Sequence, residues 1–315
     1  MNFAVVIVNW NGAVDTIGCL ESIFAGSAQA RVIVVDNGSA DDSRARIGAA
    51  LSRRGVLGTR ASLIDAGENL GFAAGCNLGL RAAQAAGCEF VVFLNNDTIV
   101  EADALDRIVQ RLADDTGCFA CLPMLTVFGT DRIWNCGGLV YPFGLRRYHL
   151  ADRPRSEGAA RGEIRCSFFT GCCFAVRTAE FVARGGFSER FFFGEEDFEL
   201  ALWMHDRALS AVCLTSAVVQ HKVSASFNAA AGSRRQAKVF IYYLNRFIHM
   251  RLRFGALRWR LWLAAYLPYA ALLLWRSGVL RAAELPGFFR RLLVRSRTMD
   301  GVTRADFEAV MAGKM

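Results

Sequence analysis

The sequence predicts an α/β fold in which a mostly parallel sheet is flanked by helices. Apolar runs at residues 3–8, 32–35 and 90–94 alternate with segments of helical periodicity. Short runs without polar alternation are typical of strands buried on both faces, as in a parallel sheet. The last two runs lead into acids, Asp36 and Asp97, so we expect a polar carboxyl edge. Ligands of open α/β sheets bind outside this edge.

The first strand, residues 3–8, leads into a turn at residues 9–12 and a helix that ends near Ala25. This helix has one apolar face, because its large side chains recur at three- and four-residue intervals. Residues 31–35 predict the second strand, and residues 63–64 mark a short third one.

Small residues from 71 to 87 predict a helix before the strand that ends at Asp97. Residues 101–113 predict another helix, with acids at its start and Arg107 and Arg111 later, the order that the helix dipole favours. No glycine-rich dinucleotide fingerprint follows the first strand, and no P-loop motif occurs. The sequence therefore argues against a dinucleotide-dependent oxidoreductase and a P-loop NTPase.

Composition and charge indicate two parts. A chain of 315 residues that is 53% hydrophobic and 21% charged suits one large domain with an appendage and excludes a disordered protein. Residues 226–315 carry 16 Lys or Arg and 4 Asp or Glu, which gives a net charge of +12. Residues 1–225 carry 21 Lys or Arg and 25 Asp or Glu, which gives a net charge of −4. We expect a globular domain over 1–225 and a basic, aromatic-rich helical region over 226–315. Residues 229–233, which are Ala, Gly and Ser, are expected to form a loose connection near this boundary.

The basic region predicts contact with an anionic membrane surface. Residues 258–276 interleave aromatic and aliphatic side chains with flanking arginines. Their uncharged core, 261–275, is 15 residues long, shorter than the roughly 17–25 needed to span a bilayer, and Pro268 is expected to break it. Together with the amphipathic segment 288–297, it indicates a segment that lies in the interface or re-enters it. A helical hairpin packed on the first domain or on a dimer partner is the alternative.

The ten cysteines predict reduced, buried thiols. They lie in apolar segments without framework spacings, and Cys118 and Cys121 form a C-x-x-C with neither a second pair nor spaced histidines, so zinc is not expected. Packed thiols of this kind suit a reducing cytosol. Residues 1–8 have no basic region and too short an apolar run for a signal peptide.

Asn95, Asn96 and Asp97 form a candidate metal site at the end of the apolar run 90–94. At the carboxyl edge of a sheet, Asp97 is suited to ligate a phosphate-bound divalent cation. The alternative is a turn that caps the next helix, since Asn and Asp favour turns. His221, which follows an apolar strand, is a further candidate ligand, although a lone histidine is most often a surface or core residue.

Four carboxylates, Glu195, Glu196, Asp197 and Glu199, precede an apolar helical stripe at residues 200–204. Asp197 continues that stripe at the first turn and is expected to face inward. Acid enrichment in a first helical turn is the alternative explanation, and it contributes only about 0.3–1 kcal/mol. Four acids preceded by three phenylalanines and a glycine exceed what capping requires, so we favour a functional role.

Five motifs occur in order within residues 3–225, at residues 6–12, 35–43, 69–79, 95–97, and 170–171 with 185–191 and 196–197. In this order they resemble the inverting glycosyltransferases of family 2, which have a GT-A fold. The resemblance is to the bacterial rhamnosyltransferase-like branch that builds surface polysaccharides. Residues 1–225 would then be the catalytic domain.

The resemblance implies a nucleotide-diphosphate sugar across the carboxyl edge and a bound Mg²⁺ or Mn²⁺. The implied donor-binding residues are Asn9, Trp10, Asn11, Asp36, Asn69, Gly71, Asn77 and Asn96. The implied metal ligands are Asp97, Asn95 and His221, with Asp97 foremost because Asn95 replaces the first acid of the D-x-D motif.

The resemblance also implies an acid–base role for Glu196 and Asp197. Asp197 would take the proton of the acceptor hydroxyl as it attacks the anomeric carbon, and Thr170, Gly171 and Phe193 would lie on the acceptor side. The family's arginine on the following helix is missing, since Trp203 and Met204 stand nearby, which puts the acceptor contacts in doubt.

The implied acceptor is a glycan or a polyprenyl-diphosphate-linked glycan, reached by the basic region. This indicates a cytoplasmic protein that is peripheral on the inner face of the plasma membrane, with no nucleic acid partner. The sequence leaves open the sugar, the nucleotide and the oligomeric state.

Two other functions remain. A sugar-nucleotide nucleotidyltransferase also uses a nucleotide-binding α/β sheet, but usually has a cationic phosphate loop after the first strand, and residues 9–12 offer no cation. A membrane scaffold with a degenerate nucleotide pocket is the other, and the presence of Asp36, Asp97 and Asp197 together weighs against it.

Overall fold

The computed structural model describes residues 1–27, 29–222 and 233–314. The chain divides into two compact units, which we call the first and the second unit. The first unit comprises residues 1–140, 146–188 and 196–223, and the second comprises residues 141–145, 189–195 and 224–315. The boundary expected near residue 225 and most of the loosened stretch, residues 229–232, lie outside the described residues.

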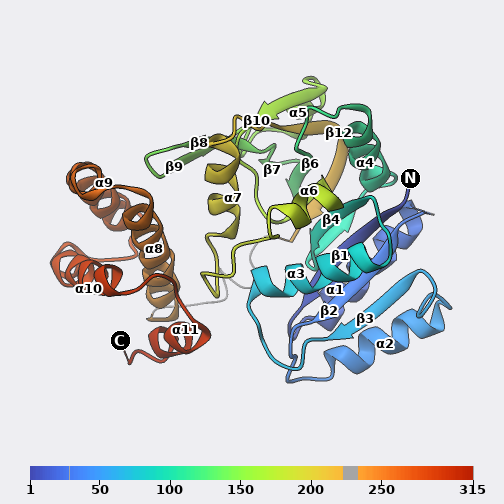
Figure 1. Cartoon of the computed structure of the whole chain (residues 1–315), viewed down its shortest axis with the longest axis horizontal. Helices are drawn as coiled ribbons and strands as arrows, with labels where there is room; N and C mark the ends of the chain where they lie inside the picture. The colour runs from blue at the N-terminus through green and yellow to red at the C-terminus, as the bar shows by residue number, and fades with distance from the viewer. Residues whose placement is uncertain (28, 223–232, 315) are drawn as a thin grey trace. The chain divides into compact units, whose positions relative to one another are not determined.

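A mixed, mostly parallel sheet forms the centre of the first unit and confirms the predicted fold class (Figure 1). Its strands are, in spatial order, β10 (Glu163–Cys166), β12 (Ala211–His221), β6 (Ala120–Val127), β11 (Cys173–Arg177), β4 (Phe90–Asn95), β1 (Phe3–Asn9), β2 (Arg31–Asp36) and β3 (Ala61–Asp65). The strands from β4 to β3 are parallel, as are β6 and β12, whereas β11 is antiparallel to β4 and β6. Shorter strands complete the set: β5 (Thr98–Val100) pairs with β12, β7 (Ile133–Asn135) with β6, and β8 (Gly138–Tyr141) with β9 (Leu145–Tyr148).

Helices cover both faces of this sheet, because successive side chains of a buried strand point to opposite sides. Phe3, Val5 and Ile7 of β1 belong to one core, and Ala4 and Val6 belong to the other. The first core is completed by α1 (Ala13–Gly26), α2 (Ser43–Arg53) and α4 (Ala104–Asp114), and the second by α3 (Phe72–Ala85), α6 (Thr178–Ala183) and α7 (Glu196–His205). A further short helix, α5, spans Arg155–Ala159.

Helix α3 approaches β1 closely because glycines lie where the two meet. A Cβ atom on Gly79 would lie 2.3 Å from Cγ1 of Val6, and one on Gly75 would lie 3.0 Å from Cγ1 of Val8. The small-residue stretch of the sequence therefore allows the helix backbone to pack directly on the strand. This contact also fixes the start of α3 near the carboxyl end of β1.

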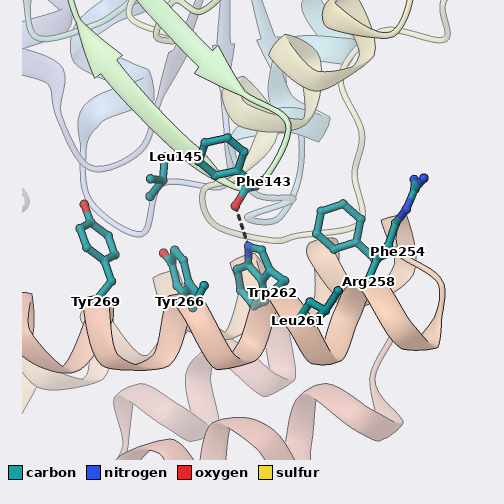
Figure 2. A pocket seen from close by; sticks show the side chains of 9 residues that line it. Phe143, Leu145, Phe254, Arg258, Leu261, Trp262, Tyr266 and Tyr269 are labelled. Atoms are coloured by element: carbon teal, nitrogen blue, oxygen red, sulfur yellow. Dashed lines mark hydrogen bonds between the residues drawn. The ribbon is translucent and has the colours of Figure 1, made fainter.

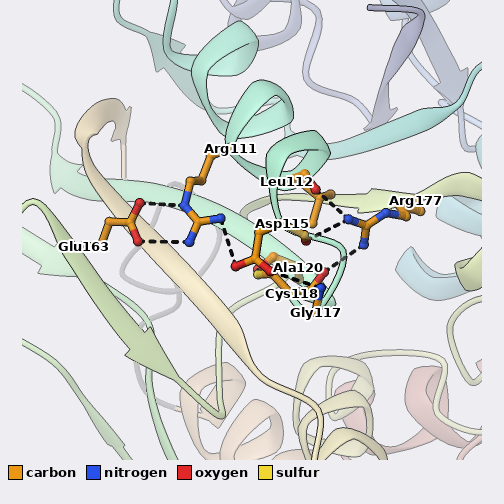
Figure 3. A network of polar contacts seen from close by, with 8 residues as sticks. All are labelled: Arg111, Leu112, Asp115, Gly117, Cys118, Ala120, Glu163 and Arg177. Atoms are coloured by element: carbon orange, nitrogen blue, oxygen red, sulfur yellow. Dashed lines mark hydrogen bonds and ion pairs between the residues drawn. The ribbon is translucent and has the colours of Figure 1, made fainter.

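Two arginines hold the C-terminal end of α4 (Figure 3). Arg111 donates to both carboxylate oxygens of Glu163 in β10, at 2.6 and 3.1 Å. Arg177, the last residue of β11, donates to the carbonyl oxygens of Leu112 and Cys118. The carbonyl of Leu112 lies in the last turn of α4, where carbonyls lack intrahelical partners, so the Arg177 cation both satisfies it and complements the helix dipole.

Two predicted element ends are wrong by a few residues. The strand predicted to end at Asp97 ends at Asn95, and the next two residues form a turn before β5. Helix α4 begins at Ala104 rather than at residue 101, because Ala102 has a left-handed φ of 39°. Glu101 lies outside the helix and accepts two hydrogen bonds from Arg155, at 2.8 and 2.6 Å.

The ten cysteines are free and buried, as the sequence predicts. Burial raises the pKa of the Cys19 thiol to about 12. The thiol of Cys118 donates to the carbonyl oxygen of Ala120 at 3.0 Å, within the stretch that contains the C-x-x-C. These thiols therefore pack as small apolar groups.

The second unit is largely helical. Its helices are α8 (Ser233–Arg253), α9 (Ala256–Arg276), η1 (Ala282–Glu284), α10 (Leu285–Thr298) and α11 (Arg304–Met311). Pro268 does not break the apolar stretch, because α9 continues through it. Proline removes one backbone hydrogen bond, and both Pro268 and Ala264, whose carbonyl loses that bond, are exposed residues. Among the described helices, none combines the length and the apolar character needed to cross a membrane.

A buried ion pair joins residues 189–195 to α8 within the second unit. Oε1 of Glu195 accepts from Nε of Arg246 at 2.7 Å and lies 3.2 Å from Nδ1 of His249. Burial raises the pKa of the Glu195 carboxyl, but the two basic groups outweigh burial and leave its pKa below the usual value. Arg246 also donates to the carbonyl oxygen of Gly144, so one guanidinium ties together all three stretches of this unit.

We predict that Gly79→Ala lowers the free energy of unfolding of the first unit by about 1–3 kcal/mol, because the new methyl group would overlap Val6. Gly48→Ala in α2 is the matched control, since a Cβ there would meet only Leu63, at 3.5 Å. This control should be neutral or stabilising by up to about 1 kcal/mol. Chemical denaturation measures both variants, and equal stabilities would contradict the close packing of α3 on β1.

Candidate active site

A chain of hydrogen bonds joins the carboxyl ends of β1, β2 and β4. Asn9, the last residue of β1, donates to Oδ1 of Asp36 at 2.8 Å and accepts from the hydroxyl of Thr16 at 2.8 Å. Asn96 donates to the same Thr16 hydroxyl at 3.0 Å, and Ser39 donates to Oδ1 of Asp36 at 2.7 Å. Asn9 and Asp36 are buried, so these bonds form the floor of the edge.

The loop after β1 carries exposed groups. Trp10 is 56% exposed. Asn11 adopts a left-handed φ of 51°, its backbone amide donates to the Ser39 hydroxyl at 2.9 Å, and its side-chain oxygen accepts from the amide of Ala40 at 2.8 Å. A Cβ on Gly12 would lie 2.8 Å from Nδ2 of Asn96, so a larger residue would disturb the floor. These contacts of Asn11 fix the loop that carries the exposed Trp10.

A second set of hydrogen bonds positions the loop before α3. Asn37 donates to Oδ1 of Asn69 and to the carbonyl oxygen of Gly71, both at 3.1 Å, and accepts from the amide of Leu70 at 3.1 Å. Gly71 has a φ of 87°, in the left-handed region that favours glycine. Two predicted donor-binding residues, Asn69 and Gly71, are therefore held by the buried Asn37, which the sequence reasoning missed.

The structure brings Asp97 and His221 together. Oδ1 of Asp97 lies 3.1 Å from Nε2 of His221. His221 is the last residue of β12 rather than a residue beyond it, and the ring of Trp134 lies 4.5 Å from its imidazole. The amide of Lys222 donates to the carbonyl oxygen of Asp97 at 2.9 Å, and its ammonium group lies 2.6 Å from Oδ1 of Asp15. A carboxylate, an imidazole and an ammonium therefore meet at this edge.

These groups fit a divalent cation only in part. A carboxylate and an imidazole are suitable ligands for Mn²⁺, and the carboxylate alone is suitable for Mg²⁺. Within the described part of the chain, no group of three or more His, Cys, Asp or Glu side chains could hold a metal ion. A cation held here would take its other ligands from water, amide oxygens or phosphate, as Mg²⁺ commonly does. Asn95, the third predicted ligand, ends β4, and its carbonyl accepts from the Thr98 hydroxyl at 2.7 Å.

The loop at Thr170 and Gly171 connects this edge to the acidic residues. The carbonyl oxygen of the next residue, Cys172, accepts from the amide of Asn95 at 2.8 Å, which sets the loop at the carboxyl end of β4. A Cβ on Gly171 would lie 3.9 Å from Oε1 of Glu196. Among the described residues, the buried hydroxyl of Thr170 has no hydrogen-bond partner.

Glu196 and Asp197 begin helix α7. Asp197 has a side chain that is 18% exposed, and its Oδ1 lies 3.7 Å from Nη1 of Arg146. The Arg146 guanidinium lies over the ring of Phe168, 5.1 Å from its centroid. The N-terminus of α7 and Arg146 thus both bring positive charge to the Asp197 carboxylate.

The other two acids of the cluster have structural partners. Glu199 pairs with Arg184 at 2.6 Å, and Glu195 forms the buried pair in the second unit. Ion pairs within the protein thus account for these two carboxylates, and the functional interpretation of Glu196 and Asp197 stays a prediction. Their partners lie 15 and 51 residues away in sequence, so the pattern of the cluster itself could not separate them from Glu196 and Asp197.

Two further predicted site residues, Asn77 and Phe193, have partners within the protein. Asn77 was assigned to the donor, but its amide donates to the carbonyl oxygen of Phe187 at 2.9 Å and accepts from the amide of the same residue at 2.8 Å. Asn77 therefore positions the loop before α7. Phe193, assigned to the acceptor side, belongs to the second unit, where its ring packs 5.4 Å from that of Phe307.

The sequence reasoning missed five residues that shape the site: Thr16, Asn37, Ser39, Arg146 and Lys222. Lys222 carried a signal, because it directly follows His221 at the end of an apolar strand. Ser39 and Asn37 lie within the acidic loop after β2, where polar residues are common. Arg146 has no sequence signal that links it to Asp197.

The family model for glycosyl transferase family 2 matches residues 4–181. The chain belongs to this family. This is the family that the five ordered motifs resemble.

Two solved structures share the GT-A fold of this family 2 glycosyltransferase. One is the crystal structure of GalNAc-T7 with UDP, GalNAc and Mn²⁺, with a TM-score of 0.57 and 15% identity, covering 78% of this chain and 48% of that one. The other is the mannosyltransferase PcManGT from Pyrobaculum calidifontis in complex with GDP-Man and Mn²⁺, with a TM-score of 0.56 and 18% identity. This match covers 99% of this chain and 86% of that one. The chain thus spans about half the length of the first structure. A search of curated proteins found no match.

Proposed function

We propose that this glycosyltransferase transfers a sugar, with inversion, from a nucleotide-diphosphate donor to a hydroxyl group of a lipid-linked or polysaccharide acceptor in cell-surface glycan synthesis. The resemblance to the rhamnosyltransferase-like branch favours rhamnose as the sugar. One observation carries the proposal: the loop at residues 170–172 contacts the end of β4 beside Asp97 and also reaches Glu196 at the start of α7. The acidic pair and the candidate metal ligands therefore share one edge of the sheet.

The donor would lie on the floor formed by Asn9, Asp36 and Asn96. The exposed indole of Trp10 offers a flat surface on which a nucleobase can stack, and Asn11 lies beside it. The loop containing Asn69 and Gly71 borders the same edge through Asn37. The two structures of similar fold contain a nucleotide or a nucleotide sugar, which supports this class of donor.

Asp97 and His221 would hold Mg²⁺ or Mn²⁺, with Asn95 at the end of the same strand. The Mn²⁺ in both similar structures supports this assignment. When bound, such a cation neutralises charge on the departing diphosphate. The amide of Lys222 binds the Asp97 carbonyl, and its ammonium group, which pairs with Asp15, lies at the same edge.

Asp197 would act as the general base. It accepts the proton of the acceptor hydroxyl while that oxygen bonds to the anomeric carbon, and the bond from this carbon to the diphosphate oxygen breaks. Attack from the face opposite the departing nucleoside diphosphate inverts the configuration. Glu196 borders the acceptor loop at Gly171, and Arg146 orients the Asp197 carboxylate.

We predict that Asp197→Asn retains donor binding and lowers turnover by about 10²-fold or more, because a positioned base is lost. Release of nucleoside diphosphate from a panel of sugar nucleotides measures turnover, and thermal shift measures donor binding. Asp103→Asn, at an exposed acid before α4, is the matched control and should leave turnover unchanged.

This assay also separates the competing functions. A nucleotidyltransferase would consume or release pyrophosphate. A scaffold would release neither pyrophosphate nor nucleoside diphosphate. Turnover of Asp197→Asn within a few-fold of the unmodified protein would remove the role of base from Asp197.

A second prediction concerns the cation. We expect EDTA to abolish transfer and Mn²⁺ to restore it, because a hard carboxylate ligand implies a divalent ion. Asp97→Ala should weaken donor affinity in the presence of Mn²⁺, as measured by calorimetry. Full activity in EDTA would overturn the metal assignment and favour a metal-free mode that uses basic side chains.

We also propose that the second unit attaches the protein peripherally to the inner face of the plasma membrane. Helix α9 exposes large apolar side chains, among them Leu257 at 71% and Trp275 at 56%. Residues 226–315 carry a net charge of +12, from 16 basic and 4 acidic residues. Basic residues near an anionic leaflet contribute on the order of 1 kcal/mol each, and aromatic side chains anchor in the interface.

The full chain should therefore co-sediment with anionic vesicles, and high salt should release only part of it, since salt screens charge but not apolar insertion. The triple variant Leu257→Ser, Leu272→Ser and Trp275→Ser should bind vesicles more weakly at high salt. Val14→Ser and Leu57→Ser, at exposed apolar residues of the first unit, serve as controls. A full chain that ignores vesicles at low salt and forms a tight dimer would make this apolar face an oligomer interface.

A further inference from the structure

The second unit contains an apolar groove between α9 and residues 141–145 (Figure 2). Its volume is about 440 Å³, and its walls include Phe143, Trp262, Tyr266 and Tyr269. Ligand sites of proteins commonly have volumes of roughly 300–1,000 Å³ and mostly apolar walls. The groove therefore has the size and lining of a small-molecule site.

The walls of the groove are held in place by specific contacts. Nε1 of Trp262 donates to the carbonyl oxygen of Phe143 at 2.6 Å. The rings of Trp262 and Tyr266 stack with centroids 4.4 Å apart and planes 16° apart, and Phe247 packs edge-on against Trp262 at 5.3 Å. The indole N–H is thus already satisfied, and the aromatic faces form a preformed apolar wall.

The shape of the groove selects its occupant. A helix with its side chains is roughly 10–12 Å across, so a cavity of about 440 Å³ holds only about one turn of a helix from a second copy. A flat bilayer surface does not fill a concave site. A single hydrocarbon chain can do so, with its length along the row of rings.

The charge beside the groove indicates which end group that hydrocarbon chain carries. Arg258 is the charged residue among those that line the groove, and it lies in a region with a net charge of +12. An arginine beside an apolar cavity is suited to a phosphate-bearing amphiphile, because its planar fork binds phosphate in a bidentate way. The occupant indicated is an anionic lipid with one chain in the groove.

We propose that the groove binds the first isoprene units of a polyprenyl diphosphate, the carrier of the acceptor, and that Arg258 binds its diphosphate. The identity of the carrier rests on the proposed function. The flat aromatic walls suit the planar double bonds of an isoprenoid. This site is distinct from the exposed apolar residues that would contact the bilayer, since Leu257, Leu272 and Trp275 do not line the groove.

The experiment uses the full chain and farnesyl diphosphate as the probe, with calorimetry in the absence of vesicles. Ala265→Trp should fill the groove and raise the dissociation constant by about tenfold or more. Ala264→Trp is the matched control, because Ala264 is an exposed neighbour on α9 that does not line the groove. Both variants add the same apolar side chain, so bulk lipid affinity changes equally in the two.

Arg258→Gln should weaken binding of farnesyl diphosphate by about tenfold and leave binding of farnesol nearly unchanged. Arg260→Gln, at an exposed arginine outside the groove lining, is the matched control. Inorganic diphosphate should not compete at equal concentration. A straight-chain diphosphate of equal carbon number that binds as tightly as farnesyl diphosphate would overturn the isoprenoid assignment in favour of an acyl lipid.

The proposal that the groove is the binding site would be overturned if the two tryptophan variants bound farnesyl diphosphate with equal affinity. It would also be overturned if the unmodified chain did not bind farnesyl diphosphate at all. The proposed function fails by a different measurement, the release of nucleoside diphosphate from sugar nucleotides. Ala265→Trp should retain donor binding by thermal shift. A chain that binds farnesyl diphosphate in the groove but uses no sugar nucleotide would refute the function and leave the groove in place.

Discussion

The hydrogen-bonded chain from Asp36 through Asn9 and Thr16 to Asn96 is the constraint on which the carboxyl edge depends. Buried amides and carboxylates are costly unless their donors and acceptors are satisfied, and here each side chain satisfies the next. The ends of three parallel strands therefore cannot shift independently. These hydrogen bonds set the positions of the loops that carry Trp10 and Asp97. The same bonds therefore contribute both to the stability of the fold and to the geometry of the site.

The parallel strands β1, β2 and β4 were predictable because their short runs, residues 3–8, 32–35 and 90–94, are wholly apolar and are bounded by polar residues. Strands such as β10, which contains Glu163 and Arg165, have no such pattern and were not predicted. The ends of elements were less predictable, because Asn, Asp and Glu serve equally well in a turn and in a first helical turn. Asn96 and Asp97 form a turn, and α4 starts later than expected, for reasons of backbone conformation that composition does not reveal.

The candidate site was predictable where position along a strand decides it. Asp97 and His221 meet because both lie at strand ends on one edge. It was not predictable where a distant partner decides the role of a polar side chain. Asn77 binds the backbone of Phe187, and Glu195 binds Arg246, although each lies within a motif that suggests ligand binding. The sequence shows which residue types are present, but not whether protein or ligand satisfies them.

The buried thiols make the two units chemically distinguishable. All ten cysteines lie in the first unit, and the second unit has none. The thiolate is the reactive form, and burial both hides these thiols and raises the pKa of groups such as Cys19. A thiol-specific reagent therefore labels the chain only when the first unit opens. Labelling reports local opening of the first unit even under conditions in which the helices of the second unit unfold.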